Sequence, residues 1–284
     1  MSKSLIPAQR RREILDHLQA HQIVRTAALC EQLGASQATI RRDLEQLERE
    51  GVLERTHGGA VLTQRLPTEP AYANSALAHP NEKRWIGREA AALVDDGDTI
   101  FLNSGTTIAE VARHLAARSD LHRITVITNS LAATLEMTGA GFEVILLGGS
   151  FRPLANSTFG AIGTSTLRQV SADKAFIGVD GITLKYGCTT PAAAEAEIAQ
   201  VMIERTRGPI VVVSDHSKWG VVSNFEIARL DQVYGLIVDE GLTREAREAL
   251  QARSLHVWMA GPDTGAVNET HNHPLAENSH VAVR

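Results

Sequence analysis

Residues 37–50 place two adjacent arginines, Arg41 and Arg42, on one side of an expected amphipathic helix. The apolar positions recur at i, i+4 and i+7, so they share the other side. These positions are Ile40, Leu44 and Leu47. An arginine guanidinium offers a planar set of donors to guanine edges and to phosphates, and small neighbouring residues permit close approach to a groove. The pattern favours contact with nucleic acid, although two arginines on a helix more often form only a solvated face.

The elements before this helix must hold its arginines outward. Helices are expected over 8–20 and 27–33, and Thr26 is positioned to cap the second of them. Ser36 is expected to cap the arginine-bearing helix. A helix, a tight turn and a second helix form the helix-turn-helix motif, whose second helix enters the major groove. The first fifth of the chain is therefore predicted to bind duplex DNA.

A hairpin is expected directly after the arginine-bearing helix. Short apolar strands over 52–55 and 60–63 flank a turn that contains His57, Gly58 and Gly59. Such a hairpin forms a wing, and its tip can bring backbone N–H groups close to a phosphate. Read alone, the two glycines indicate no more than a turn.

The body of the chain, residues 82–239, alternates helical stretches with short β-branched runs, which indicates a largely parallel α/β sheet. The expected strands lie at 98–103, 124–129, 142–149, 174–180, 209–215 and 233–239. In open parallel sheets, ligands bind beyond the carboxyl ends of the strands. The loops at 102–107, 128–130, 147–153 and 214–220 follow expected strands and are expected to meet at one edge of the sheet.

These loops carry residues suited to an anion. Gly105 has no side chain where a phosphate would sit, and Thr106 and Thr107 begin a helix whose N–H groups and hydroxyls can bind it. Lys218 supplies a mobile positive charge. Together they indicate a sugar-phosphate pocket. Each loop taken singly is also consistent with an ordinary turn and helix cap.

The run "LGASQATIRRDLEQLEREGVLERTHGGA" closely resembles the winged helix-turn-helix of DeoR-type bacterial transcriptional regulators. The runs "EKRWIGREAAALVDDGDTIFLNSGTT" and "VVVSDHSKWG" resemble the sensor domain of the same family. The resemblance implies a mostly parallel α/β sensor that shares its fold with ribose-5-phosphate isomerase and coenzyme A transferases. It also implies a phosphorylated sugar or sugar acid as effector.

The residues and the resemblance together predict two sites. The DNA-binding residues are expected to be Thr26, Ser36, Gln37, Ala38, Thr39, Arg41, Arg42, His57, Gly58 and Gly59. The effector-binding residues are expected to be Asn103, Ser104, Gly105, Thr106, Thr107, Thr128, Asn129, Ser130, Gly148, Gly149, Arg152, Asp180, Gly187, Thr189 and Lys218. The chain departs from the family at Asn103, often acidic there, and at Ala199 and Gln200, where a basic residue is common.

The expected organisation is a winged helix-turn-helix over 6–62, a linker with three prolines over 63–80, a sensor domain over 81–260 and a disordered tail over 261–284. Residues 1–65 carry ten Lys and Arg against eight Asp and Glu, a net +2, and the remainder carries 18 against 25, a net −7. We expect a homodimeric or homotetrameric repressor of a carbohydrate catabolic operon. Its partners would be double-stranded operator DNA and the effector.

A sugar-phosphate isomerase fused to a DNA-binding module is the alternative. Isomerisation needs a carboxylate base and an electrophile for the oxyanion. Asp180, Glu195 and Glu197 are the candidate bases, with Lys218 as electrophile. The sequence "GVDGIT" lacks the longer acidic run of the isomerases, so we expect a protein that is not an enzyme.

No cofactor and no metal site are expected. The two histidines of "HNH" at 271–273 have no cysteine or carboxylate cluster beside them, and Asp215 with His216 supplies too few ligands. Cys30 and Cys188 are the two cysteines of the chain, which favours a reducing cytoplasm, here associated with the nucleoid. No apolar run approaches the roughly 18–20 residues of a membrane span.

Overall fold

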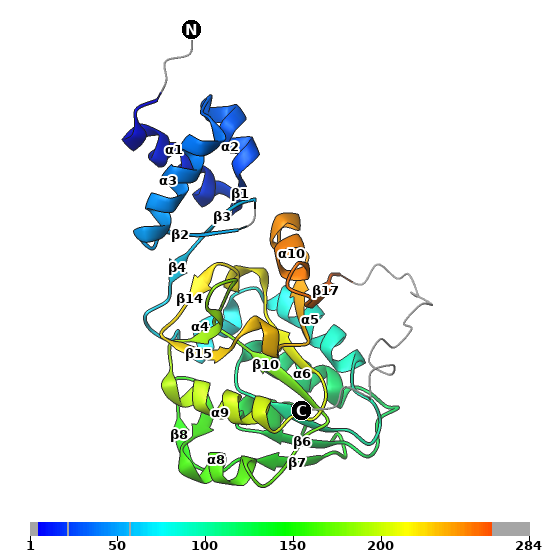
Figure 1. The fold of residues 1–284 in the computed structure, drawn as a ribbon. Coiled ribbons are helices and arrows are strands. Elements are labelled where there is room, and N and C mark those ends of the chain that lie inside the picture. The colour runs from blue at the N-terminus through cyan, green and yellow to red at the C-terminus, as the bar shows by residue number, and fades with distance from the viewer. Residues whose placement is uncertain (1–4, 22, 57, 263–284) are drawn as a thin grey trace.

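The computed structural model describes residues 5–21, 23–56 and 58–262. The N-terminal part combines helices with an antiparallel sheet of strand order β1-β3-β2 and stands at one end of the molecule (Figure 1). Its elements are α1 (Pro7–His21), β1 (Ile23–Arg25), α2 (Thr26–Leu33), α3 (Gln37–Arg49), β2 (Leu53–Arg55) and β3 (Gly59–Leu62). The predicted helix-turn-helix and its wing are therefore present.

Helix α3 forms as its sequence predicts. The Ser36 side chain accepts a hydrogen bond from the Thr39 amide at 3.2 Å, which satisfies one of the free N–H groups at the helix start. The apolar side of α3 packs into the core of the domain. Its buried residues there are Ile40, Leu44 and Leu47. The side with the arginines consequently faces outward.

Thr26 does not cap α2, and that expectation was wrong. Arg25 occupies the N-cap position in extended backbone, and Thr26 is the first, buried residue of the helix. The reason is β1, a strand that the sequence analysis missed and that runs directly into α2. The Thr26 amide donates to the Gly58 carbonyl at 2.7 Å, which ties the start of α2 to the β2–β3 turn.

Residues 63–80, the expected linker, lie against the sensor domain. They contain β4 (Gln64–Arg65) and α4 (Tyr72–Leu77). Strand β4 pairs in parallel with β14 (Val221–Val222). The Tyr72 amide donates to the Leu154 carbonyl at 2.8 Å. These hydrogen bonds tie the segment to the sensor as it leaves the winged domain.

The sensor domain is built on a parallel sheet of strand order β17-β16-β13-β10-β5-β6-β7. Six strands were expected from the sequence, and β17 at the edge was not. In chain order the strands are β5 (Thr99–Leu102), β6 (Thr125–Thr128), β7 (Glu143–Leu146), β10 (Lys174–Gly178), β13 (Ile210–Val213), β16 (Gly235–Asp239) and β17 (His256–Ala260). The mostly parallel α/β fold class is confirmed.

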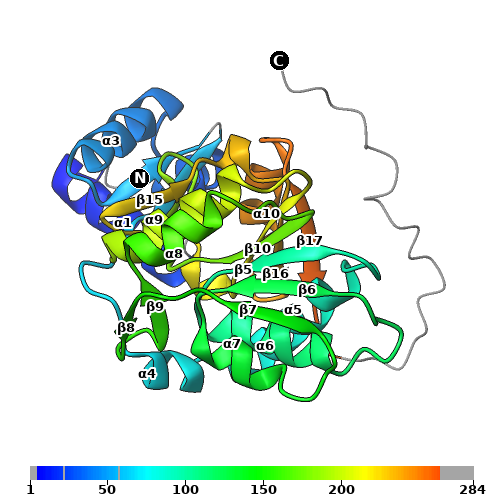
Figure 2. The ribbon, with the colours of Figure 1, turned by 90° about the horizontal axis from the view of Figure 1, so that it is seen from below.

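Helices cover both faces of this sheet, as Figure 2 shows. One face packs against α5 (Pro80–Ala92), α6 (Thr106–Ala116) and α7 (Leu131–Glu136), the other against α8 (Ala161–Leu167), α9 (Ala193–Glu204) and α10 (Arg244–Gln251). Successive side chains of a strand point to opposite faces, so Val211 and Val213 join one core and Val212 the other. A sheet buried on both faces explains why its strands read as continuous apolar runs.

Shorter elements border the sheet. Antiparallel strands form the small sheets β11-β12-β15 and β8-β9. Their bounds, with those of two 3₁₀ helices, are β8 (Ser150–Arg152), β9 (Ser157–Phe159), β11 (Gly181–Thr183), β12 (Gly187–Thr190), η1 (His216–Lys218), β15 (Phe225–Ala228) and η2 (Leu230–Gln232). Residues of β12, β15 and η1 line the cavity at the carboxyl ends of β5 and β10, whereas η2 leads into the amino end of β16.

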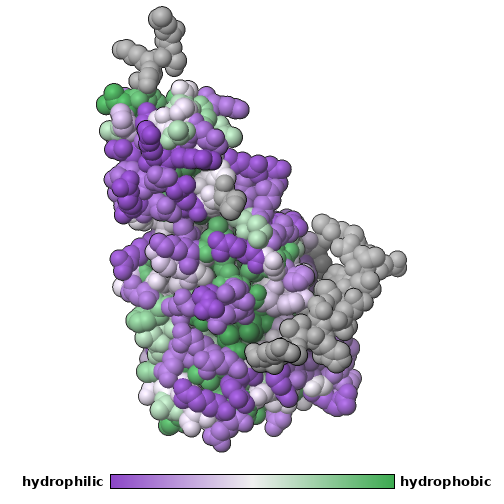
Figure 3. All heavy atoms as spheres, viewed as in Figure 1, coloured by the Kyte–Doolittle hydropathy of each residue, from purple (hydrophilic) through white to green (hydrophobic). Residues whose placement is uncertain are grey.

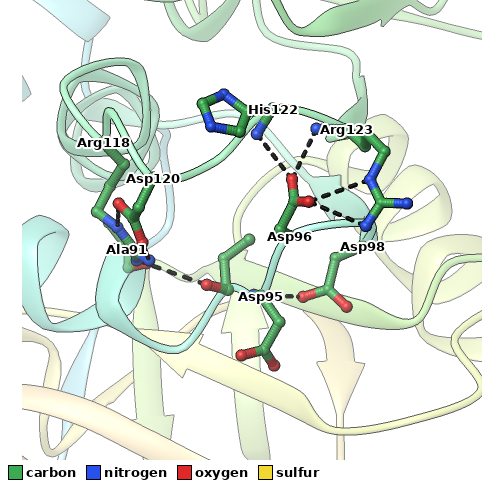
Figure 4. Close-up of polar contacts among 9 residues, drawn as sticks. Ala91, Asp95, Asp96, Asp98, Arg118, Asp120, His122 and Arg123 are labelled. Carbon is green, nitrogen blue, oxygen red and sulfur yellow. Dashed lines mark hydrogen bonds and ion pairs between the residues drawn. The ribbon is translucent and has the colours of Figure 1, made fainter.

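The acidic run "DDGD" before β5 fixes loops at the amino ends of the strands (Figure 4). Asp96 Oδ1 accepts hydrogen bonds from the amides of His122 and Arg123, both at 2.7 Å. These hydrogen bonds, helped by the Arg123 side chain, lower the pKa of Asp96 to about 2. The Lys174 ammonium bridges Asp95 and Asp98 at 2.6 Å each. This carboxylate cluster is thus used for structure.

None of the helices in the described part of the chain is long and apolar enough to cross a bilayer. The expectation of a disordered tail concerns residues that, from 263 onward, lie outside the described ranges.

Candidate functional site

A hollow lies between α2, α3 and the β2–β3 turn, and half of the predicted DNA-binding residues line it. Those five are Thr26, Gln37, Arg41, Gly58 and Gly59. Gly59 is needed at its position, because a Cβ there would lie 1.8 Å from the Val24 carbonyl oxygen of the paired strand. The start of α3 and the wing therefore border one concave surface.

Arg41 and Arg42 are both exposed on α3. Within the described residues neither guanidinium has a hydrogen bond or an ion pair. Other arginines nearby are engaged: Arg55 pairs with Glu45 at 3.1 Å, and Arg49 donates to the Glu45 carbonyl at 3.3 Å. Within the described residues, the two predicted DNA-reading arginines are thus available for an external acceptor.

The other predicted DNA-binding residues have varied surroundings. Gln37 and Ala38 are exposed beside Arg41, while the Thr39 hydroxyl lies 2.9 Å from the Ser36 hydroxyl. Ser36 and Thr39 thus already serve to cap α3. His57 lies outside the described residues.

A second cavity, of about 270 Å³, opens at the carboxyl ends of β5 and β10. The chain continues from β5 to one side of the sheet and later returns to place β10 on the other side, so this is the switch point where open α/β sheets bind ligands. The predicted effector residues that line it are Asn103, Ser104, Gly105, Thr106, Thr107, Asp180 and Lys218.

One part of this cavity suits an anion. Gly105 occupies the N-cap of α6 with φ 132° and offers no side-chain acceptor to the first N–H groups of the helix. Lys218 and Lys83 line the same cavity. Lys83 is buried, and its ammonium donates to the carbonyls of Ser75 and Ala78 at 2.5 and 2.6 Å. Burial lowers the pKa of Lys83, with the nearby Lys218 charge adding to the effect.

Carboxylates form another part of the lining. Glu195 is buried and accepts hydrogen bonds from the hydroxyls of Ser104 and Ser157, the latter at 2.5 Å. Asp180 accepts one from Thr190 at 2.8 Å. Burial raises the pKa of Glu69, although the adjacent Arg152 opposes this. Carboxylate oxygens of this kind can accept hydrogen bonds from the hydroxyls of a sugar.

Asn103 joins the two strands of the switch point. Its Nδ2 donates to the Gly178 carbonyl at 3.0 Å and its Oδ1 accepts from the Gly178 amide at 2.7 Å. An ionised carboxylate has no donor for that carbonyl. The departure from an acidic residue at this position therefore has a structural use in this chain.

The remaining predicted effector residues do not line the cavity. They are Thr128, Asn129, Ser130, Gly148, Gly149, Arg152, Gly187 and Thr189. Ser130 caps α7, accepting from the Ala133 amide at 3.2 Å, and Thr128 accepts from the Ser130 amide at 3.0 Å. Asn129 donates to the Thr158 carbonyl at 3.0 Å. These three residues form hydrogen bonds that hold the loop over 128–130 in place.

The glycines and Thr189 owe their positions to packing. A Cβ on Gly149 would lie 2.3 Å from the Phe159 carbonyl oxygen, and one on Gly187 2.3 Å from that of Ala228. Gly148 lies beside Ile162. Thr189 accepts from the Ser223 amide at 3.0 Å, and strand alternation gives its neighbour Thr190 the place in the cavity.

Sequence reasoning missed the part of the lining that comes from residues 69–83. These lining residues are Glu69, Pro70, Tyr72, Asn74, Ser75, Ala78 and Lys83. Arg152 contributes indirectly, through its ion pair with Glu69. A charged and an aromatic residue in a proline-containing segment were the available signal, but nothing in the local pattern indicated where the segment would pack.

The cavity is connected to the wing through the chain itself. Lys218 precedes Trp219 and Gly220, and the Gln64 amide donates to the Gly220 carbonyl at 2.8 Å. A Cβ on Gly220 would lie 2.5 Å from the carbonyl oxygen of Leu62, the last residue of β3. Gly220, two residues after η1, therefore packs directly against the end of the wing.

Comparison with solved structures finds similarity at low identity. The ribose 5-phosphate isomerase of Methanocaldococcus jannaschii is 20% identical, with 50% of this chain and 55% of that chain covered at a TM-score of 0.38. The sorbitol operon regulator SorC of Klebsiella pneumoniae is 11% identical, with 75% and 90% covered at a TM-score of 0.35.

Sequence comparison covers nearly the whole chain. The DeoR-like helix-turn-helix domain model matches residues 10–65, and the DeoR C terminal sensor domain model matches residues 78–240. An uncharacterized HTH-type regulator of Haemophilus influenzae is 31% identical over 91% of this chain and all of its own. The transcriptional repressor GlcR of Bacillus subtilis is 32% identical over 89% and 96%. The chain therefore belongs to the DeoR family of helix-turn-helix transcriptional regulators.

Proposed function

We propose that this regulator is a repressor of a carbohydrate catabolic operon and that a phosphorylated sugar or sugar acid in the sensor cavity controls it. The observation that carries the proposal is the composition of that cavity. Lys83, Lys218 and the start of α6 favour a phosphate, while Asp180 and Glu195 favour hydroxyl groups. A phosphorylated sugar carries both kinds of group.

The repressor role is supported by the exposed Arg41 and Arg42, which have no partner within the described residues, and by the roles that similar proteins are named for. GlcR of Bacillus subtilis and a putative aga operon protein of Escherichia coli O157:H7 are both named transcriptional repressors.

Hydrophilic residues predominate on the visible face of the N-terminal domain, whereas an apolar strip runs down the middle of the sensor domain (Figure 3). We propose that two or four copies assemble so that their paired winged domains bind repeated half-sites.

Control would pass from η1 through β14 to β4 and the wing. An effector that draws Lys218 toward its phosphate shifts the strand that pairs with β4. A second tie lies across the same junction, where Arg25 pairs with Glu248 of α10 at 2.8 Å. Differential contacts in two such arrangements typically couple ligand and DNA binding by about 1–3 kcal/mol.

A thermal-shift screen of the full-length protein tests the effector. A ligand present at about 100 times its Kd stabilises the folded state by about 2.7 kcal/mol. We expect one phosphorylated sugar or sugar acid to raise the unfolding temperature and to change operator affinity in a mobility-shift assay, while its unphosphorylated form does neither. Equal shifts from the unphosphorylated form would contradict a phosphate site.

The isomerase alternative has one favourable observation, since Asp180, Glu195 and Lys218 share the cavity. Glu197, the third candidate base, is exposed on α9 and does not line the cavity. The relatives with assigned names are regulators, and we propose no turnover for this chain. Conversion of ribose 5-phosphate that disappears in Asp180→Asn would establish the enzyme instead.

A further inference from the structure

Three side chains from distant parts of the sequence converge at the margin of the effector cavity. One possible ligand atom of each of His79, Asp215 and His216 lies within 4.8 Å of the others. His79 occupies the N-cap of α5, Asp215 that of η1, and His216 begins η1. Asp215 also lines the cavity, so the cluster and the cavity share a wall.

His216 is held as a metal-binding histidine is commonly held. Its Nδ1 lies 2.7 Å from Oδ2 of the buried Asp239, and its amide donates to Asp239 Oδ1 at 2.7 Å. A carboxylate that accepts a hydrogen bond from Nδ1–H fixes the tautomer and orientation of the ring and leaves the lone pair of Nε2 for a metal ion. Asp239 has no direct access to that nitrogen and acts as a positioning residue.

The other two residues have ligand atoms to spare. Asp215 accepts from the Ser217 amide through Oδ1 at 3.0 Å, which leaves Oδ2. Within the described residues the His79 imidazole has no hydrogen bond, and it meets the His216 ring edge-on with 4.8 Å between centroids. His79 has φ 51°, in the left-handed region where asparagine, aspartate and histidine are the more frequent non-glycine residues.

We propose that His79, Asp215 and His216 bind one divalent transition-metal ion of the zinc class. Two imidazoles and one carboxylate form a set of three protein ligands that leaves a coordination position open to water or to a ligand oxygen. The ion adds positive charge next to Asp215, on the side of the cavity that holds Lys83 and Lys218. An anionic effector then binds more tightly with the ion than without it, a consequence that rests on the proposed function.

The test is a zinc titration of the full-length protein by calorimetry, after treatment with a chelator and in the absence of any effector. Without effector, the result reports on the ion alone and stands whether or not a sugar phosphate binds. We expect one equivalent per chain. The absence of stoichiometric binding would overturn the proposal.

The variants separate this cluster from the histidines of the "HNH" run. We expect the bound equivalent of zinc to persist in the double variant His271→Ala, His273→Ala. It should be lost in His79→Asn, which keeps a residue suited to positive φ. Asp215→Asn, which retains the cap of η1, should lose it as well. Unchanged thermal unfolding of the metal-free variants shows that they fold. Loss in the double variant with retention in both ligand variants would overturn the assignment.

Asp239→Asn tests the positioning role. Loss of an outer partner of a metal-binding histidine lowers metal affinity by about 10- to 100-fold. We expect such a fall, with the stoichiometry unchanged. Affinity equal to that of the unmodified protein would remove Asp239 from the site.

Discussion

The proposed DNA-binding surface takes its residues from one stretch, 26–59, whereas the proposed effector cavity takes its residues from segments spread between Glu69 and Ile227. The first has caps, helical spacing and a turn that can be recognised within a few dozen residues. The second exists only where loops after separate strands meet, joined by a segment that precedes the sheet in sequence. A local motif and a composite site therefore leave very different traces in a sequence.

The two regions also use charge differently. At the proposed DNA-binding surface, Arg41 and Arg42 are exposed and free of partners within the described residues, so that they can meet an external anion. In the cavity several charged groups are buried and held by neighbours, as Glu195 is by Ser104 and Ser157 and Lys83 by two carbonyls. A surface that meets a large polyanion needs reach, while a cavity for a small ligand needs fixed geometry.

The largest expected effect is a loss of stability that is confined to the winged domain. Asp43 is buried and pairs with the buried Arg10 at 2.5 Å. Removing one partner of a buried pair costs about 3–5 kcal/mol, because the other charge stays buried. Asp43→Ala should unfold the winged domain at lower denaturant concentration and weaken operator binding, while effector binding persists.

Asp231→Ala, which breaks an exposed pair with Arg229, is the control and should cost about 0–1 kcal/mol. Loss of effector binding in Asp43→Ala would show that the winged domain and the cavity do not fold separately.

The next effect concerns the cavity alone. Lys218→Ala removes a cation that we propose binds the phosphate, and hydrogen bonds to charged groups contribute about 1.5–3 kcal/mol. Effector affinity should fall by about 10- to 150-fold and the response of operator binding should vanish, with operator affinity itself unchanged. Thermal shift measures effector affinity, and a mobility-shift assay measures operator binding with and without effector. Arg168→Ala, which removes an exposed cation at the C-cap of α8, is the matched control. A normal response in Lys218→Ala would place the effector elsewhere.

A comparable or smaller effect is expected at the DNA-binding surface. Arg41 borders the hollow with Gln37 and the wing, so Arg41→Ala should lose about 1–3 kcal/mol of preference for the operator over unrelated DNA. Competition binding at several salt concentrations measures this. A uniform loss on all DNA with a flatter salt dependence would instead make Arg41 a phosphate contact. Arg49→Ala, at the far end of α3, serves as control.

The smallest effect lies at the junction of the two regions. Glu54 of β2 accepts from the Leu184 amide of the sensor at 3.1 Å, and burial raises its pKa from the usual 4.5. A carboxyl with a raised folded-state pKa favours folding below its unfolded pKa and loses this contribution as pH rises through the folded-state value. Glu54→Gln should therefore flatten the decline in stability above about pH 4.5. Unfolding midpoints measured across pH test this, with Glu204→Gln as the control. A decline in Glu54→Gln as steep as that of the unmodified protein would contradict the prediction.

Much of the fold could be predicted, and the elements that were missed were missed for two physical reasons. The sheet strands with β-branched runs were found, but β17, whose sequence is "HVWMA", was not. Its place depends on Trp258, whose ring lies so close to Gly235 that a Cβ there would be 2.3 Å away. Strand β1 and helix α4 were missed as well, since three and six residues are too few for a periodic pattern.

The sequence by itself determined the winged helix-turn-helix and the alternation of strands and helices, because caps, turns and hydrophobic spacing act between residues close in the chain. Tertiary structure alone decided which polar residues face the cavity, that Glu69 and Lys83 belong to it, and that His79 meets Asp215 and His216. The physical reason is the long crossovers of a parallel sheet, which bring residues a hundred or more positions apart to one edge, where only packing sets the direction of each side chain.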